Sequence, residues 1–209
     1  EVDRSLKAIM SDIHDRIAAE GREGNRINYR RGANIAGYRK VATAISAYGE
    51  VKMNGAELFV SCLQEAGVRI IYGVPGEENT HLMMALQASD IRFVLTRHEQ
   101  AAAFMASVYG RLTGKPAGCL STLGPGATNL LTGVADATLD YVPLIAITAQ
   151  AGRARMSLSE SHQVIDLEAL FRPVTKSSHM LMSAEAMPGI VAEAVRQACA
   201  ARPGAVHLS

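Results

Sequence analysis

Leu95-Thr96-Arg97-His98-Glu99-Gln100 is the stretch of this chain that decides its fold. It follows an apolar run, residues 91–95, that predicts a buried strand, and it leads into an alanine-rich run, residues 101–109, that predicts a helix. Glu99 therefore stands at a strand-to-helix corner, where open α/β sheets bind their ligands. A carboxylate before an apolar helix is poorly solvated, which favours its protonated form and makes Glu99 a candidate proton carrier. The alternative is a first-turn glutamate that only interacts with the helix dipole, and the spacing alone favours this alternative.

Helix and strand patterns alternate on both sides of this corner, from residue 53 to the end of the chain. The expected strands are residues 69–74, 91–96, 117–122, 143–149, 178–182 and 205–208. The expected helices are residues 55–66, 77–88, 98–113, 127–139, a short one near 166–170, and 186–201, with a loop at 150–165. Such alternation implies right-handed crossovers. The sequence therefore predicts an α/β fold, a doubly wound and mostly parallel sheet with helices on both faces.

The first 52 residues follow a different pattern, which predicts a short helical segment ahead of this domain. Apolar residues recur at helical spacing over residues 1–20, namely Leu6, Ile9, Met10, Ile13 and Ile17. Residues 22–31 are polar and basic and predict a connection, and a second helix is expected over residues 34–48. The pattern changes after Lys52, and Met53-Asn54-Gly55-Ala56 is typical of the start of a protein. We therefore expect two parts, residues 1–52 and 53–209.

Composition excludes several classes of function. The net charge is +1, which gives no electrostatic case for binding nucleic acid or an anionic membrane, and no apolar run reaches membrane-spanning length. The three cysteines are scattered without a CxxC pair, which favours reduced thiols over disulfides or a metal site. The chain begins with Glu1 and has no signal peptide, so we expect a processed chain or a fragment in the cytoplasm.

Two glycine-rich turns share the expected ligand-binding edge with Glu99. Gly73-Val74-Pro75-Gly76 and Gly124-Pro125-Gly126-Ala127-Thr128-Asn129 each join a strand to a helix. Glycine lets the backbone approach a ligand closely, and the second turn could bind an anion at a helix N-terminus. The simpler alternative is a pair of tight turns, because neither spacing fits GxGxxG or GxxxxGK[ST]. His98 and His162 are candidates for polar chemistry, although hydrogen-bonded structural histidines are more common.

Taken together, these motifs make residues 53–209 similar to a known family. They resemble the N-terminal, pyrimidine-binding domain of thiamine diphosphate-dependent enzymes of the acetolactate synthase type. The matching stretches are residues 73–76, 97–100, 120–130, 161–163, 172–176 and 202–204. Residues 1–50 resemble the C-terminal tail of the hexameric glutamate dehydrogenases, on residues 1–10, 28–29 and 32–38. The catalytic residues of those dehydrogenases lie outside such a tail, so no dehydrogenase site is transferred.

The resemblance implies roles for particular residues. In this family the glutamate that matches Glu99 hydrogen-bonds the aminopyrimidine ring of thiamine diphosphate and favours the tautomer that deprotonates the thiazolium carbon. The residues that match the pyrimidine pocket or its subunit interface are Pro75, Gly76, Thr122 and Asn129. Two positions near the substrate channel match Gln163 and Lys176, and one that contacts flavin in FAD-containing members matches Arg202. Those members have a Phe-Gln pair where this chain has His162-Gln163, which is closer to the flavin-free branch and speaks against FAD.

The resemblance also implies a reaction and its limits. The family decarboxylates a 2-keto acid such as pyruvate and transfers the two-carbon unit to a second 2-keto acid, in branched-chain amino acid biosynthesis or the acetoin pathway. The matched domain is one of three, and the magnesium and diphosphate belong to a domain that is not recognisable here, so no metal ligand is assigned. We expect a homodimer or tetramer in the full enzyme and no activity from this chain alone. The alternatives are a non-catalytic dimerising fragment, or a domain of a pyruvate oxidase or another 2-keto acid decarboxylase.

Overall fold

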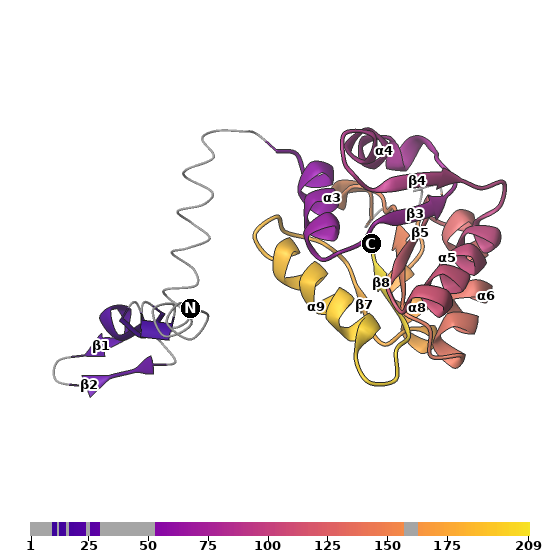
Figure 1. Ribbon diagram of the computed structural model, residues 1–209. Helices are drawn as coiled ribbons and strands as arrows, with labels where there is room; N and C mark the ends of the chain where they lie inside the picture. Colours follow the sequence, from indigo (N-terminus) through magenta and orange to yellow (C-terminus); the bar gives the residue numbers. More distant parts are fainter. Residues whose placement is uncertain (1–9, 12, 16, 24–25, 30–52, 157–162) are drawn as a thin grey trace. The chain divides into compact units, whose positions relative to one another are not determined.

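The computed structural model describes residues 10–11, 13–15, 17–23, 26–29, 53–156 and 163–209 of the chain (Figure 1). The chain divides into two compact units, Glu1–Lys52 and Met53–Ser209, and each is described by itself. In the described part of the chain, no helix is both long enough and apolar enough to cross a bilayer.

The first unit contains a helix and a small hairpin. Residues 10–11, 13–15 and 17–20 are helical, as the apolar spacing predicted. The polar connection predicted over residues 22–31 contains a pair of strands that was not predicted, β1 (Arg22–Glu23) antiparallel to β2 (Arg26–Ile27). A backbone hydrogen bond from Asn28 to Gly21, 2.8 Å long, closes this hairpin. The helix expected over residues 34–48 lies outside the described residues.

The second unit is built on six parallel strands. They are β3 (Ile70–Gly73), β4 (Arg92–Leu95), β5 (Ala117–Ser121), β6 (Leu144–Thr148), β7 (Ser178–His179) and β8 (Ala205–Leu208), in the order β4-β3-β5-β6-β8-β7. Each neighbouring pair is parallel. Because the chain leaves β3 first toward β4 and later returns to β5 on the other side, the sheet is doubly wound. This confirms the predicted fold class.

Helices cover both faces of the sheet, and each face has its own hydrophobic core (Figure 1). One face carries α3 (Gly55–Glu65), α4 (Thr80–Gln87) and α9 (Met187–Cys199), and its core includes Leu63, Ile71 and Val191. The other carries α5 (Glu99–Thr113), α6 (Pro125–Leu139) and α8 (Leu167–Phe171), and its core includes Leu130 and Phe171. The side chains of β3 and β5 alternate between these cores, as the pleat of a strand requires.

Several element boundaries differ from the sequence prediction for local reasons. Helix α6 begins at Pro125 and not at Ala127. Proline suits the first helical position, because the N–H that it lacks would have no partner within the helix and its fixed φ is helical. The helix expected over residues 77–88 is divided into a 3-10 turn, η1 (Glu77–Asn79), and α4. The expected loop at 150–165 contains a short helix, α7 (Arg153–Met156), and a 3-10 turn, η2 (Arg172–Val174), follows α8. Strand β7 is shorter than predicted.

Candidate functional site

The carboxyl edge of the sheet brings together the loops that follow β3, β4 and β5. The strand order changes direction at β3, because β4 lies on one side of it and β5 lies on the other. Backbone hydrogen bonds tie the three loops together, from Thr96 N–H to the Gly73 carbonyl (2.9 Å) and from Val74 N–H to the Leu120 carbonyl (3.2 Å). Open α/β sheets bind ligands in the crevice at such a divergence. The loops therefore form the first candidate for a functional site.

Glu99 lies in this crevice and is held by Asn129. Glu99 is the first residue of α5, and His98 caps this helix by accepting a hydrogen bond at Nδ1 from Gln100 N–H (3.1 Å). The amide Nδ2 of Asn129, in the second turn of α6, donates to Oε2 of Glu99 over 3.0 Å. Both side chains are half-buried. His98 thus has a structural role in the helix, and Asn129 fixes the direction of the Glu99 carboxylate.

Glycines make the walls of the crevice around Glu99. A Cβ placed on Gly126 would lie 2.6 Å from Thr122 Oγ1 and 3.3 Å from Glu99 Oε1, and a Cβ on Gly76 would collide with Thr122 Cγ2. Thr122 therefore packs against both glycines, and the absence of side chains at both positions lets the two turns lie this close to each other beside Glu99. Gly126 belongs to the glycine-rich turn singled out in the sequence, but its contact with Glu99 was not predicted.

The structure places Gln163 against the same turn. Gly124 has a φ of +56°, and a Cβ on it would lie 2.6 Å from the carbonyl oxygen of Gln163 and 2.7 Å from its Cβ. Gln163 therefore packs directly on the loop that carries Thr122 and Gly126. Its neighbour His162 lies outside the described residues.

Asn79 is a residue of this site that the sequence prediction missed. It is buried, its Oδ1 accepts from Gly76 N–H (2.9 Å), and its Nδ2 donates to the Val74 carbonyl (3.3 Å). These bonds fix the turn at Gly76 and leave Pro75 exposed in the same loop. The signal in the sequence is an asparagine three residues after the glycine, which is suited to such local bonds to the backbone.

Lys176 and Arg202 are not brought together with Glu99 in this chain. Lys176 precedes β7 and Arg202 precedes β8, so both lie at the amino edge of the parallel sheet, whereas Glu99 follows the carboxyl end of β4. The ammonium of Lys176 donates to the carbonyls of Gln197 (2.5 Å) and Arg202 (3.0 Å), and it thereby ties the end of α9 to the turn before β8. The observed role of Lys176 is structural, and its predicted place near a substrate channel stays a prediction, as does the flavin contact of Arg202.

The chemistry available at the crevice is that of one carboxylate beside two glycine-containing turns. Oε2 of Glu99 accepts from Asn129, whereas Oε1 faces Gly126, so one oxygen can share a proton with a ring nitrogen of a flat ligand. Among the described residues, no group of three or more His, Cys, Asp or Glu side chains is placed to hold a metal ion. The described residues of the crevice thus offer one oriented carboxylate as a hydrogen-bonding group.

Comparisons with known proteins agree with this arrangement. Residues 53–170 match the family model described as thiamine pyrophosphate enzyme, N-terminal TPP binding domain. The chain is similar to acetolactate synthase 3, chloroplastic, of Brassica napus, with 42% identity over 169 residues, which cover 80% of this chain and 26% of that protein.

Two bacterial proteins show a similar degree of likeness. Acetolactate synthase isozyme 2 large subunit of Escherichia coli is 43% identical over 154 residues, 74% of this chain and 28% of that protein. Acetolactate synthase of Bacillus subtilis is 43% identical over 159 residues, 76% of this chain and 28% of that protein. The chain thus spans about a quarter of the length of these curated relatives. The resemblance of residues 1–50 to glutamate dehydrogenase stays a prediction.

Proposed function

Since the chain belongs to the thiamine pyrophosphate enzymes, whose N-terminal TPP binding domain it carries, we propose that residues 53–209 form the pyrimidine-binding half of an acetolactate synthase-like carboligase. The observation that carries the proposal is the Glu99 carboxylate, held by Asn129 at 3.0 Å in a crevice walled by glycines. The proposed substrate is a 2-keto acid such as pyruvate. Thiamine diphosphate supplies the electron sink for decarboxylation when it is bound.

The residues of the crevice fit an aminopyrimidine ring. Glu99 would share a proton with a ring nitrogen, because its half-buried carboxylate has one oxygen that faces Gly126. Asn129 would keep that oxygen directed at the ring by holding the other one. Gly76 and Gly126 would allow the ring to lie close to the backbone, and Thr122 would line the space between them. Magnesium and the diphosphate would be held by a separate diphosphate-binding domain.

An apolar stripe on α5 supports association with a second subunit. Its members Phe104, Met105, Val108 and Leu112 are spaced along one side of the helix and are 37%, 44%, 53% and 80% exposed. Exposed apolar stripes of this kind usually lie in protein–protein interfaces. Because Glu99 begins the same helix, a partner subunit that covers the stripe would stand close to the crevice. The same observation favours the second candidate function, a non-catalytic dimerising fragment.

Binding of the isolated pyrimidine tests the proposal on the chain itself. We expect 4-amino-5-hydroxymethyl-2-methylpyrimidine, at millimolar concentration, to shift the backbone NMR signals of residues 73–76, 96–100 and 122–129. Glu99→Ala should weaken this binding at least about tenfold, because a hydrogen bond to a charged group contributes about 1.5–3 kcal/mol. Glu65→Ala, at an exposed glutamate in α3, is the matched control and should leave the binding unchanged. Equal binding by the Glu99→Ala and Glu65→Ala variants would contradict the role of Glu99.

A turnover assay tests the expected inactivity of the chain alone, and pyrimidine binding separates the two candidate functions. We expect no pyruvate consumption by the 209-residue chain with thiamine diphosphate and magnesium, because the proposal assigns the diphosphate and magnesium to a separate domain. Sedimentation should show a dimer in either case. Pyrimidine binding that depends on Glu99 favours the enzyme half, whereas a dimer that does not bind the pyrimidine favours the interaction fragment.

A further inference from the structure

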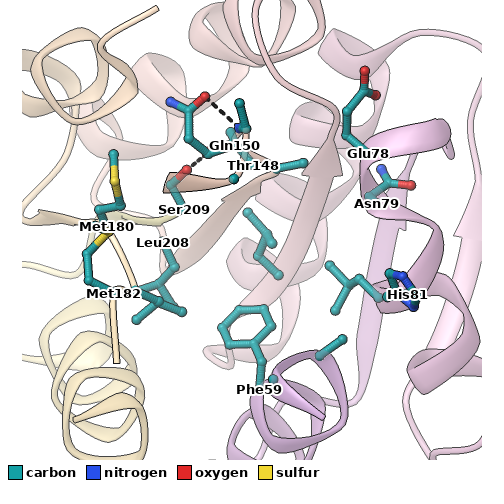
Figure 2. Close-up of a pocket in the computed structure, with 18 of the residues that line it drawn as sticks. Phe59, Glu78, Asn79, His81, Thr148, Gln150, Met180, Met182, Leu208 and Ser209 are labelled. Atoms are coloured by element: carbon teal, nitrogen blue, oxygen red, sulfur yellow. Dashed lines mark hydrogen bonds between the residues drawn. The ribbon is translucent and has the colours of Figure 1, made fainter. Parts of the chain in front are cut away.

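A second cavity, of about 390 Å³, opens at the carboxyl edge of β6 and β8. It lies on the face of the sheet that is covered by α3, α4 and α9, and its size is in the range of small-molecule sites (Figure 2). Neither Glu99, Thr122 nor Asn129 lines it. It is therefore distinct from the crevice of the proposed function.

Methionines contribute a third of the apolar residues that line this cavity. Of the nine methionines in the chain, four line it, namely Met156, Met180, Met182 and Met187. Figure 2 shows Met180 and Met182 on one side of the cavity and Phe59 on its floor. Methionine side chains are flexible and polarisable, and they adapt to apolar ligands of different shape. Met182 is 44% exposed, so its side chain remains accessible to a ligand.

The polar groups at the end of β6 and β8 already have partners within the protein. Thr148 Oγ1 donates to Ser209 Oγ over 3.1 Å. The side chain of Gln150 accepts from Ala151 N–H (2.9 Å) and donates to the Ile165 carbonyl (3.0 Å). A ligand does not need to satisfy these groups. Burial of apolar surface is therefore the main favourable contribution to binding here.

The charge on the rim of the cavity is negative. Among the described residues that line it, Glu78 has the one side-chain carboxylate, His81 is the other titratable side chain, and none is a lysine or arginine. Glu78 is exposed, and no ion pair joins it to a described residue. An anionic ligand would meet Glu78 without a compensating cation, whereas an ammonium group would be attracted. The cavity is thus unsuited to the carboxylate of a keto acid or to a diphosphate.

We propose that this cavity binds a small amphipathic amine, with its apolar body among the methionines and its ammonium group at Glu78. The proposal does not depend on the carboligase function, since its evidence is the cavity alone.

Three eight-carbon probes that differ in their head group test the proposal on the full chain. They are octylamine, octanol and octanoate, each titrated below its aggregation concentration at pH 8 and 50 mM salt. The readout is the NMR signal of the methionine methyl groups. We expect octylamine to shift the signals of Met156, Met180, Met182 and Met187. It should bind about fivefold more tightly than octanoate, with the affinity of octanol between the two. The difference is small because the charge of Glu78 is exposed and screened by salt.

Two charge reversals make the test specific. Glu78→Lys should reverse the order, so that octanoate binds more tightly than octylamine. Glu77→Lys is the matched control, because Glu77 is exposed and adjacent but does not line the cavity, and it should keep the original order. The proposal is overturned by octanoate binding as tightly as octylamine, by an unchanged order in the Glu78→Lys variant, or by shifts confined to Met83 and Met105, which lie outside the cavity.

Discussion

His207 is fully buried in β8 and is surrounded by uncharged partners. Its ring is stacked on Phe171, with 4.1 Å between the ring centroids. Nε2 lies 2.9 Å from Thr148 Oγ1, and Nδ1 lies 2.7 Å from Ser178 Oγ. Because Thr148 Oγ1 donates to Ser209, it accepts from Nε2–H, and Nδ1 then accepts from Ser178. A neutral ring therefore satisfies every hydrogen bond at this position.

The pKa of His207 gives the stability of the domain a specific pH dependence. Burial in the first place, and the neighbouring His179 in the second, lower the pKa of His207 to about 3. The ordinary pKa of histidine is about 6.5, so the unfolded chain binds one proton more than the folded chain between pH 3 and 6.5. Protons therefore favour unfolding in this window, and the free energy of unfolding should fall as the pH is lowered from 7.

From pH 7 to pH 5 the free energy of unfolding of the parent protein should fall. We predict that this fall is about 2 kcal/mol smaller in the His207→Gln variant. Urea unfolding at both pH values measures this loss in the parent and in the variant. Carboxylates titrate in both proteins, so the difference between the two losses is the quantity that reports on His207. His81→Gln, at an exposed histidine, should keep the loss of the parent protein. Equal losses in the parent and the His207→Gln variant would show that the ring is protonated in the folded state.

At the scale of residues, the motifs named candidate side chains but not where these side chains meet. Glu99, Thr122 and Asn129 were assigned by motif, and the structure brings them to one crevice. The bond between Glu99 and Asn129 joins residues 30 positions apart, so it depends on how α5 and α6 pack, which no local pattern encodes. Lys176 and Arg202 were also assigned by motif, but the structure does not bring them to the crevice. A motif carries no information about which edge of the sheet it will reach.

The pairing of α5 with α6 is the element-scale feature that sets the geometry of the crevice. The two helices meet through small residues, and Gly133 of α6 lies directly against Ala103 of α5. A Cβ on Gly133 would lie 2.6 Å from Ala103 Cβ and 3.1 Å from the backbone nitrogen of Phe104. Since backbone atoms cannot rotate away, only separation of the helices would relieve this contact.

We predict that Gly133→Ala lowers the free energy of unfolding by about 1–3 kcal/mol, the usual effect of overpacking. Because the helices must move apart, the same variant should also weaken pyrimidine binding by lengthening the bond between Asn129 and Glu99. Gly189→Ala in α9 is the matched control, since a Cβ there meets nothing within 4 Å. It should raise the free energy of unfolding by up to about 1 kcal/mol through helix propensity. Denaturant unfolding measures both, and a neutral Gly133→Ala would contradict the close contact.

The sequence predicted the existence of the elements of residues 53–209 better than their ends. The sequence predicted all six strands of the sheet, and the fully buried β5, β6 and β8 are the strands whose burial matches a continuous buried run. Strand β4, which was expected to be buried, has Arg92 and Leu95 exposed, and β7 is half-buried. The split of η1 from α4 was not predicted, since it depends on Asn79 bonding back to Gly76. The hairpin of β1 and β2 was missed because two-residue strands leave no periodicity to detect.

For the molecule as a whole, alternating helices and strands predicted the doubly wound sheet but not its strand order. The order β4-β3-β5-β6-β8-β7 places β8, the last strand, inside the sheet, and nothing local to residues 205–208 indicates this position. The change of pattern at Lys52 lies where the structure divides into two compact units. The identity of residues 1–52 as a domain of their own stays a proposal.

We predict that residues 53–209 fold without residues 1–52. Helix α3 has its own N-cap within this unit, because Asn54 Oδ1 accepts from the backbone of Ala56 and Glu57, each at 3.0 Å, and Glu57 Oε2 accepts from Asn54 N–H at 2.9 Å. Both cores of the sheet are made of residues within the unit. The shortened chain should therefore unfold in one cooperative thermal transition, within about 3 °C of the corresponding transition of the full chain.

A deeper truncation provides the contrast for this prediction. A chain of residues 67–209 lacks α3, and with it Leu63 and Phe59, which are buried in the core beside α9. Losing two large core side chains and the helix that carries them removes several kcal/mol of stability, so this chain should fail to unfold cooperatively. Calorimetry and limited proteolysis distinguish the two truncations. If the chain of residues 53–209 also lacked a transition, the first unit would be part of the folding unit of the sheet.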